Sequence, residues 1–347
     1  MMLVSVVVPV FNGAATVACA IKSVLAQEFD GEFEVIVVND GSTDRTARVL
    51  RSFGDRIRIV TQENRGLSAA RNVGTREACG RYIAWIDADD VWLPGRLGET
   101  VIPLEKDRNV VGAFADGVEV DARGRSLNRY IVPPAQRHAP SLDEMLRTLW
   151  EIRPSAALVR RDLLEWIGGF PEEFGRSGYG GEDVLTFLRL RQFGPLLFVA
   201  KPLIRYTVSS FDQVLNKRAA TLLSVRGRSA RREQLQLLLR PHQVFANLVR
   251  LHFGVAGQTL ARAAQRYQAD MLTALGLHAI NRGDTALARE CYLMALKVAP
   301  AAIKTWLRLA FAYAPEAVAS RVLSVVPMRA RRALVGPPFG AAGAHAT

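Results

Sequence analysis

The sequence predicts an α/β fold with a mostly parallel central sheet flanked by helices, followed by an all-α C-terminal region. Apolar, β-rich runs alternate with amphipathic helical stretches over the first hundred residues, which is the pattern of a parallel sheet covered by helices. The run at 82–86 is apolar throughout, as expected of a strand that is buried on both faces. Beyond Phe211 the composition changes to Leu, Ala, Arg and Gln with helical periodicity.

The overall composition narrows the class of protein. A chain of 347 residues exceeds one domain of roughly 150 residues, so we expect one large domain with an appendage, or two domains. The three cysteines are far apart and lack metal-ligand spacing, which indicates packing residues in a reducing compartment. The apolar run at 4–11 contains Pro9 and is too short for a membrane span or a signal sequence. We therefore expect a cytoplasmic protein.

The net charge of +12 is unevenly distributed along the chain. Residues 1–210 carry a net charge of −1, whereas residues 211–347 carry +13. Such a basic region could contact nucleic acid, an anionic membrane surface or an acidic protein partner. It lacks the interleaved aromatic residues and the motifs of nucleic-acid-binding proteins, so we expect no nucleic-acid partner.

The first hundred residues form strand and helix pairs. We predict strands at 3–10, 33–38, 56–61 and 82–86, and helices at 14–27, 45–53 and 67–78. Right-handed connections between parallel strands bring the carboxyl ends of the strands to one edge of the sheet. This arrangement brings Asp40, Arg71 and Asp87 to the same edge.

Three carboxylates, Asp87, Asp89 and Asp90, follow the fourth predicted strand. Open α/β sheets bind ligands beyond the carboxyl ends of their strands, and clustered carboxylates repel one another unless a cation or hydrogen bonds compensate. Hard divalent ions prefer oxygen ligands, so Mg²⁺ or Mn²⁺ bridging a substrate diphosphate is the natural partner. The alternative is that Asp90 caps the next helix and the other two are solvated.

The next stretch alternates again between strands and helices. We predict two strands within 107–127 with a turn at 122–124, helices at 142–150 and 161–167, and a strand at 155–159. The aperiodic segment 128–139 is predicted to be a binding loop. A glycine-rich stretch from residue 168 then leads to Glu182 and Asp183 at the start of an amphipathic helix, where the helix dipole favours carboxylates. An ordinary helix N-terminus with an acidic first turn is the alternative.

Four motifs occur in order in the first hundred residues: SVVVPVFN, VVNDGSTD, ENRGLSAARNVG and WIDADD. Together they resemble the nucleotide-sugar half of the inverting family 2 glycosyltransferases, which have the GT-A fold. The resemblance implies a nucleoside-diphosphate sugar donor, with a UDP-sugar as the first candidate. The implied donor-binding residues are Pro9, Phe11, Asn12 and Asp40 for the nucleoside, Arg71 for the diphosphate, and Asp87 and Asp89 as the D-x-D motif, with Asp89 as the metal ligand.

The pair Glu182 and Asp183 resembles the E-D pair of the same family. The resemblance implies that Asp183 deprotonates the acceptor hydroxyl and that Glu182 orients acceptor or donor hydroxyls. Inversion needs a base on the face opposite the leaving diphosphate, and one carboxylate within hydrogen-bond reach suffices. Ser209 stands where the family often has a metal-binding histidine, so the metal would be held by Asp89, the diphosphate and water. Altered metal dependence or loss of activity remains an alternative.

The C-terminal region contains a pattern that resembles a tetratricopeptide helix-turn-helix of about 34 residues. The matching residues are Leu272, Leu275, Gly276, Ala279, Gly283, Ala288, Tyr292, Ala295 and Pro300, with a partial second copy at Trp306, Leu309, Ala310 and Tyr313. An ordinary amphipathic hairpin is the alternative. From Gly336 the tail is rich in Gly, Ala and Pro, which predicts disorder. The predicted domains are therefore 1–215, 216–330 and 331–347.

From these observations we expect a metal-dependent, inverting glycosyltransferase that moves a sugar to an acceptor hydroxyl in cell-surface polysaccharide or glycolipid synthesis. A lipid-linked acceptor would place it at the inner face of the membrane, where the basic helical region could contact anionic lipid or a protein partner. The alternative is a catalytically silent nucleotide-sugar-like domain that serves as an adaptor through its helical tail.

Overall fold

The computed structural model describes residues 3–147, 150, 152–173, 181–208, 245–281, 284–300, 305 and 309. The chain divides into two compact units. The first contains Met1–Ser209 and Gln243–Ala261, and the second contains Ser210–His242 and Arg262–Thr347. Residues 243–261, which follow the boundary predicted after residue 215, belong to the first unit.

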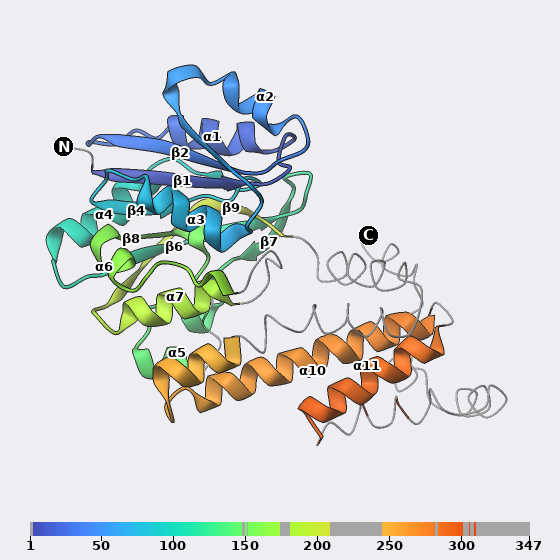
Figure 1. Ribbon diagram of the computed structural model, residues 1–347. Coiled ribbons are helices and arrows are strands. Elements are labelled where there is room, and N and C mark those ends of the chain that lie inside the picture. Colours follow the sequence, from blue (N-terminus) through green and yellow to red (C-terminus); the bar gives the residue numbers. More distant parts are fainter. Residues whose placement is uncertain are drawn as a thin grey trace. The chain divides into compact units, whose positions relative to one another are not determined.

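The first unit is built on a nine-stranded sheet with the order β3-β2-β1-β4-β8-β6-β9-β5, with β7 paired to β6 (Figure 1). Its strands are β1 (Val4–Val10), β2 (Phe33–Asp40), β3 (Arg58–Gln62), β4 (Tyr82–Trp85), β5 (Val91–Trp92), β6 (Gly112–Val120), β7 (Ser126–Tyr130), β8 (Ala157–Arg160) and β9 (Leu196–Thr207). Strands β1 to β4 are parallel, as predicted. The second half is mixed, because β8 runs antiparallel to both β4 and β6, while β6 and β9 are parallel.

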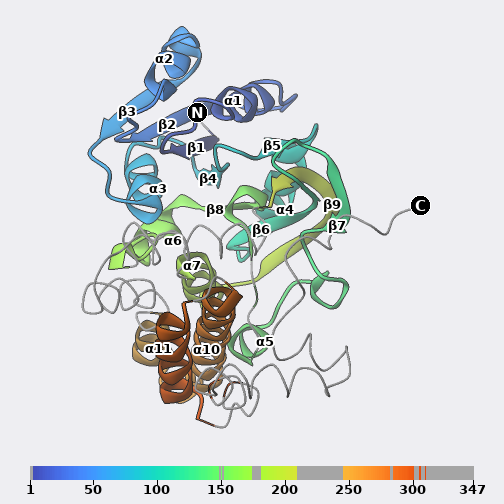
Figure 2. The same ribbon diagram turned by 90° about the vertical axis from the view of Figure 1, so that its right-hand side faces the viewer.

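The helices cover both faces of this sheet. They are α1 (Val17–Leu25), α2 (Thr46–Arg51), α3 (Leu67–Arg76), α4 (Arg96–Lys106), α5 (Leu142–Arg147), α6 (Arg161–Trp166) and α7 (Glu182–Arg191), with short 3₁₀ turns at Gly54–Arg56, Pro134–Gln136 and Pro154–Ala156. In Figure 2 the blue strands lie between α1 above and α3 below. Alternate residues of β1 face opposite sides, as the pleat requires: Val6 joins the core that contains Ile21 of α1, and Val7 faces Gly74 of α3.

The contact between α3 and the sheet depends on a glycine. A Cβ atom at Gly74 would lie 2.2 Å from Cγ1 of Val7, so the helix could not pack this closely on β1 with a larger residue. Trp85 of β4 meets Phe170 edge-on on the same side, with ring centroids 5.2 Å apart. These contacts fix α3, which carries Arg71, against the strands that end at the predicted site.

The segment 128–139 is only partly the loop that its sequence predicts. Residues up to Tyr130 continue strand β7, which pairs with the edge of β6. Strand pairing therefore overrides the weak local pattern here, as it often does for β-structure. The loop itself begins after Tyr130 and contains the 3₁₀ turn Pro134–Gln136.

The second unit contains most of α10 (Gln258–Asn281) and all of α11 (Thr285–Val298). Gly276 allows the two helices to approach, since a Cβ atom there would lie 2.5 Å from Cε1 of Tyr292, and both Leu272 and Ala288 are fully buried in the shared core. A helical hairpin is thus present, while its assignment as a tetratricopeptide repeat stays a prediction. Gly283, most of the second copy and the tail from Gly336 lie outside the described residues. Within the part of the chain that is described, no helix has the length and apolar character needed to cross a membrane.

Candidate nucleotide-sugar site

Asp40 lies at the carboxyl end of β2 and organises the loop that follows β3. Its Oδ1 accepts hydrogen bonds from Nε2 of Gln62 at 2.7 Å and from the backbone N of Arg65 at 2.9 Å. Its Oδ2 accepts from the backbone N of Gly66 at 2.9 Å. The carboxylate is buried and these bonds hold the entry to α3, so a nucleoside contact by Asp40 would be made by a side chain that is already fixed.

The loop after β1 is joined to the turn after β2. Oδ1 of Asn12 accepts hydrogen bonds from the backbone N of Thr43 at 2.8 Å and of Asp44 at 3.3 Å. Phe11 beside it is 51% exposed, which leaves its ring available to stack on a base. Pro9 is different, because it is a buried residue inside β1. The structure therefore brings Phe11, Asn12 and Asp40 to one edge and leaves Pro9 beneath that edge.

The turn that carries the three aspartates is held at both ends by residues distant in sequence. Oγ of Ser155 accepts from the backbone N of Asp87 at 3.0 Å. The backbone N of Thr207 donates to Oδ1 of Asp90 at 2.8 Å, and its Oγ1 donates to the carbonyl of Asp89 at 2.5 Å. Helix α4 begins after Gly95, its N-cap residue, so the alternative that Asp90 caps this helix is wrong.

The carboxylates of this turn disfavour one another's charge. The pKa of Asp89 is raised to about 6, first because protein atoms crowd its carboxyl although the residue as a whole is exposed, and second because of the Asp87 charge. Burial and the charges of Asp87 and Asp89 raise the pKa of Asp90 as well. Within the described part of the chain, Oδ2 of Asp90 is buried and has no hydrogen-bond partner. A site with excess negative charge and an unsatisfied oxygen suits a cation.

Arg71 lies in the interior, at the centre of a carboxylate network. Its Nη2 donates to Oδ1 of Asp87 at 2.9 Å, and its Nη1 lies 3.7 Å from Oε1 of Glu182. Burial alone would lower the pKa of Arg71, but the charges of Asp87 and Glu182 raise it above the ordinary value. The guanidinium also lies over the ring of Phe170, 5.1 Å from its centroid. Arg71 thus connects the aspartate turn to the start of α7.

Glu182 and Asp183 occupy the first turn of α7. Glu182 is buried against Arg71, whereas Asp183 is only half-buried. Burial raises the pKa of Tyr206, the charge of Arg153 opposes this, and the charges of Asp90, Asp87 and Asp183 raise it further. Asp183 therefore shares one electrostatic environment with the aspartate turn. Arg71 thus brings Asp87 and Glu182 together, and Asp40 ends β2, two strands from β4 in the sheet.

Several residues of this edge carry no motif that the sequence could reveal. Tyr206 of β9 lies under the guanidinium of Arg153, whose Cζ is 5.2 Å from the ring centroid. Asn72 holds the loop after α6, donating to the carbonyl of Phe170 at 2.8 Å and accepting from its backbone N at 2.8 Å. A polar residue one position after Arg71 is the only signal for this contact. Ser209 lies outside the described residues.

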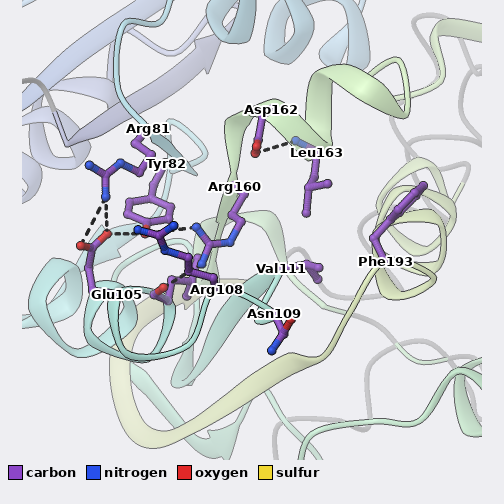
Figure 3. A pocket seen from close by; sticks show the side chains of 11 residues that line it. Arg81, Tyr82, Glu105, Arg108, Asn109, Val111, Arg160, Asp162, Leu163 and Phe193 are labelled. Carbon is purple, nitrogen blue, oxygen red and sulfur yellow. Dashed lines mark hydrogen bonds and ion pairs between the residues drawn. The ribbon is translucent and has the colours of Figure 1, made fainter.

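A cavity of about 610 Å³ lies at the opposite edge of the sheet (Figure 3). It lies beside Tyr82, the first residue of β4, and Arg160, the last residue of the antiparallel β8. Figure 3 shows Arg81 and Glu105 on one side and Phe193 on the other. Arg160 donates to the carbonyls of Leu104 and Val110, both at 2.7 Å, so it stabilises the end of α4. This cavity is separate from the candidate site.

The carboxylates of the candidate site suit a metal ion that is bound partly by the protein and partly by the substrate. Across the described ranges, no group of three His, Cys, Asp or Glu side chains has the arrangement of a metal site. Asp89 is the exposed carboxylate of the cluster, and Mg²⁺ is typically bound by one or two carboxylates together with substrate phosphates and water. The residues present are compatible with such an ion and would supply Asp89 as its ligand.

Part of the chain is similar to known glycosyltransferases. Residues 5–168 match the family model described as Glycosyl transferase family 2. A glycosyltransferase of Rickettsia prowazekii (strain Madrid E) is 36% identical over 176 residues, which are 49% of this chain and 54% of that protein. The Escherichia coli UDP-Glc:alpha-D-GlcNAc-diphosphoundecaprenol beta-1,3-glucosyltransferase WfgD is 31% identical over 133 residues, 38% of this chain and 51% of that protein. The chain thus spans about half the length of these two relatives.

Solved structures confirm the fold. The crystal structure of Staphylococcus aureus TarS 1–349 in complex with UDP has a TM-score of 0.52 and 20% identity, covering 90% of this chain and 91% of that chain. The mannosyltransferase PcManGT from Pyrobaculum calidifontis, in complex with GDP-Man and Mn²⁺, has a TM-score of 0.50 and 19% identity, covering 96% of this chain and 83% of that chain. The predicted α/β fold of the GT-A type is therefore correct. Residues 5–168, which contain the four motifs, are the part of the chain that matches the glycosyl transferase family 2 model.

Proposed function

We propose that the protein transfers a sugar from a nucleoside-diphosphate sugar to an acceptor hydroxyl with inversion. The observation that carries this proposal is the buried Arg71, which contacts Asp87 on one side and Glu182 on the other. This link places the D-x-D turn and the E-D pair at one edge of the sheet, where donor and acceptor can meet. Phe11, Asn12 and Asp40 then border the nucleoside side of that edge.

Each side chain has a separate task in the proposed reaction. Asp183 is half-buried at a helix N-terminus and takes the proton from the acceptor hydroxyl. Glu182, held by Arg71, orients the substrate hydroxyls near it. A divalent ion bound through Asp89, Mg²⁺ or Mn²⁺, would neutralise charge on the departing diphosphate.

We infer the substrate class from the substrates of the similar proteins. The E. coli relative takes UDP-glucose and a sugar carried by diphosphoundecaprenol, and TarS structures contain UDP or UDP-GlcNAc. We therefore assign a UDP-sugar as donor and a hydroxyl of a lipid-linked or polymeric surface glycan as acceptor. Synthesis of cell-surface polysaccharide at the inner face of the membrane is the proposed role.

Thermal stabilisation by nucleotide sugars, with and without Mn²⁺, tests the donor assignment, because a ligand that binds only the native state raises the melting temperature. UDP-sugars should raise it in a metal-dependent way. Asp162→Asn, at the opposite edge of the sheet, is the control and should respond like the wild type. Stabilised protein without sugar transfer to any lipid-linked acceptor would favour the adaptor alternative. No response to any nucleotide would refute the proposal.

A further inference from the structure

A helix from the C-terminal part of the chain packs along α7. Residues 245–253 are helical and belong to the first compact unit. A Cβ atom at Gly181, the N-cap residue of α7, would lie 2.8 Å from Cδ2 of Phe245 and 3.0 Å from Cε2. The helix at 245–253 therefore begins against the N-terminus of α7.

Phe245 is a core residue of this contact. It is 2% exposed, and Val249 one turn later is fully buried. Gly181 has a positive φ of 81°, a conformation that glycine adopts without strain. The absence of a side chain at this position is what allows the Phe245 ring to cover the backbone where α7 begins.

The first turn of α7 is thus held from two sides. Arg71 contacts the buried Glu182, and Phe245 covers Gly181. Asp183 is the next residue, half-buried, with its carboxyl in the electrostatic environment of Tyr206 and the aspartate turn. Within this turn, Oδ1 of Asp183 accepts a hydrogen bond from the backbone N of Val184 at 2.8 Å, so the backbone that Arg71 and Phe245 hold in place also orients the Asp183 carboxyl.

We propose that Phe245 is a positioning residue for Asp183, so that a segment far outside the matched family domain completes the reactive centre. The inference rests on the proposed function. A reacting group displaced by about 1 Å can cost roughly a hundredfold in rate. Loss of the Phe245 ring should therefore reduce the rate of transfer without reducing donor binding, because the donor contacts lie on the other side of Arg71.

The test uses the full chain with Phe245→Ala, Phe245→Leu and the control Val249→Ala. We expect kcat to fall roughly tenfold to a hundredfold in Phe245→Ala, with unchanged KM for the donor, and to recover largely in Phe245→Leu. Val249→Ala removes a buried side chain from the same helix without touching Gly181, so it should keep its kcat. If Phe245 acts through Asp183, the double variant Phe245→Ala with Asp183→Asn should transfer sugar no more slowly than Asp183→Asn alone.

A second measurement is independent of activity. The backbone N of Leu185 donates to the carbonyl of Gly181 at 3.0 Å, so its hydrogen exchange reports on the first turn of α7. Exchange should accelerate in Phe245→Ala and not in Val249→Ala. Unchanged exchange and kcat in Phe245→Ala, an equal loss of kcat in Val249→Ala, or a further loss in the Asp183→Asn background would overturn the inference. If the wild type transfers no sugar but Leu185 N–H exchange is still faster in Phe245→Ala than in Val249→Ala, the proposed function is refuted and the contact between Phe245 and Gly181 stands.

Discussion

Nη2 of Arg71 donates a 2.9 Å hydrogen bond to Oδ1 of Asp87, and the arginine side chain is only 2% exposed. A charge at this depth is stable only because carboxylates surround it, and removing one partner of a buried ion pair leaves the other charge uncompensated. The pair therefore has a structural role that an arginine on the surface of a diphosphate site would not have.

The substitution Arg71→Met should destabilise the protein by about 3–5 kcal/mol, the usual cost of breaking a buried pair. Arg81→Met is the matched control, because Arg81 pairs with Glu105 at 3.0 Å while both side chains are about half exposed. Exposed pairs contribute about 0–1 kcal/mol. Urea unfolding of both variants measures the difference. Equal midpoints would show that the Arg71 network contributes nothing to stability.

The substitution Asp89→Asn should abolish metal-dependent binding of the nucleoside diphosphate and leave the fold intact. Asp89 is exposed and its side chain has a raised pKa beside Asp87, so the amide relieves repulsion while removing the anionic ligand that a divalent ion needs. Calorimetric titration of UDP with Mn²⁺ compares this variant with the wild type. Equal affinities would assign the metal to other residues.

The substitution Asp183→Asn should preserve donor affinity and remove most of the sugar transfer. The amide has nearly the same shape but cannot accept the proton, and loss of a general base typically costs about a hundredfold or more. Steady-state kinetics with a fixed acceptor separate kcat from the KM for the donor. Asp162→Asn, which lies in the cavity at the other edge of the sheet, should have wild-type kinetics. A transfer rate that is unchanged in Asp183→Asn would place the base elsewhere.

The sequence predicts most of the first half of the sheet because each signal there is local. The strands from β1 to β4 are short apolar runs between helical patterns, and the rule that parallel strands share a carboxyl edge brings Asp40 and Asp87 together without further information. The acidic turn after β4 could also be predicted from the local sequence. The alternative, in which Asp90 caps the next helix, could be rejected only from the structure, because α4 starts after Gly95.

The remaining contacts could not be predicted, since they join residues far apart in sequence through common residue types. Nothing in a lone serine shows that Ser155 accepts from the Asp87 backbone, and Thr207 reaches Asp90 only because β9 enters the sheet beside β5 and β6. The same holds for Phe245, an apolar residue in a helical pattern that gives no sign of its contact with Gly181. Long-range pairing determines these positions, and periodicity carries no information about it.

The basic C-terminal region should bind anionic membranes in a reversible, salt-sensitive way. Residues 211–347 carry a net charge of +13, and each basic side chain near an anionic bilayer contributes about 1 kcal/mol before screening. Arg262 and Arg266 are exposed one turn apart on α10. Replacing both with Gln should weaken binding to anionic vesicles about tenfold or more at low salt.

Arg108→Gln with Arg123→Gln removes the same charge from exposed positions of the first unit and should have little effect. Co-sedimentation with neutral and anionic vesicles at low and high salt measures these differences. Wild-type protein that remains in the supernatant with anionic vesicles at low salt would exclude a membrane role, and the helical region would then be assigned to protein contacts.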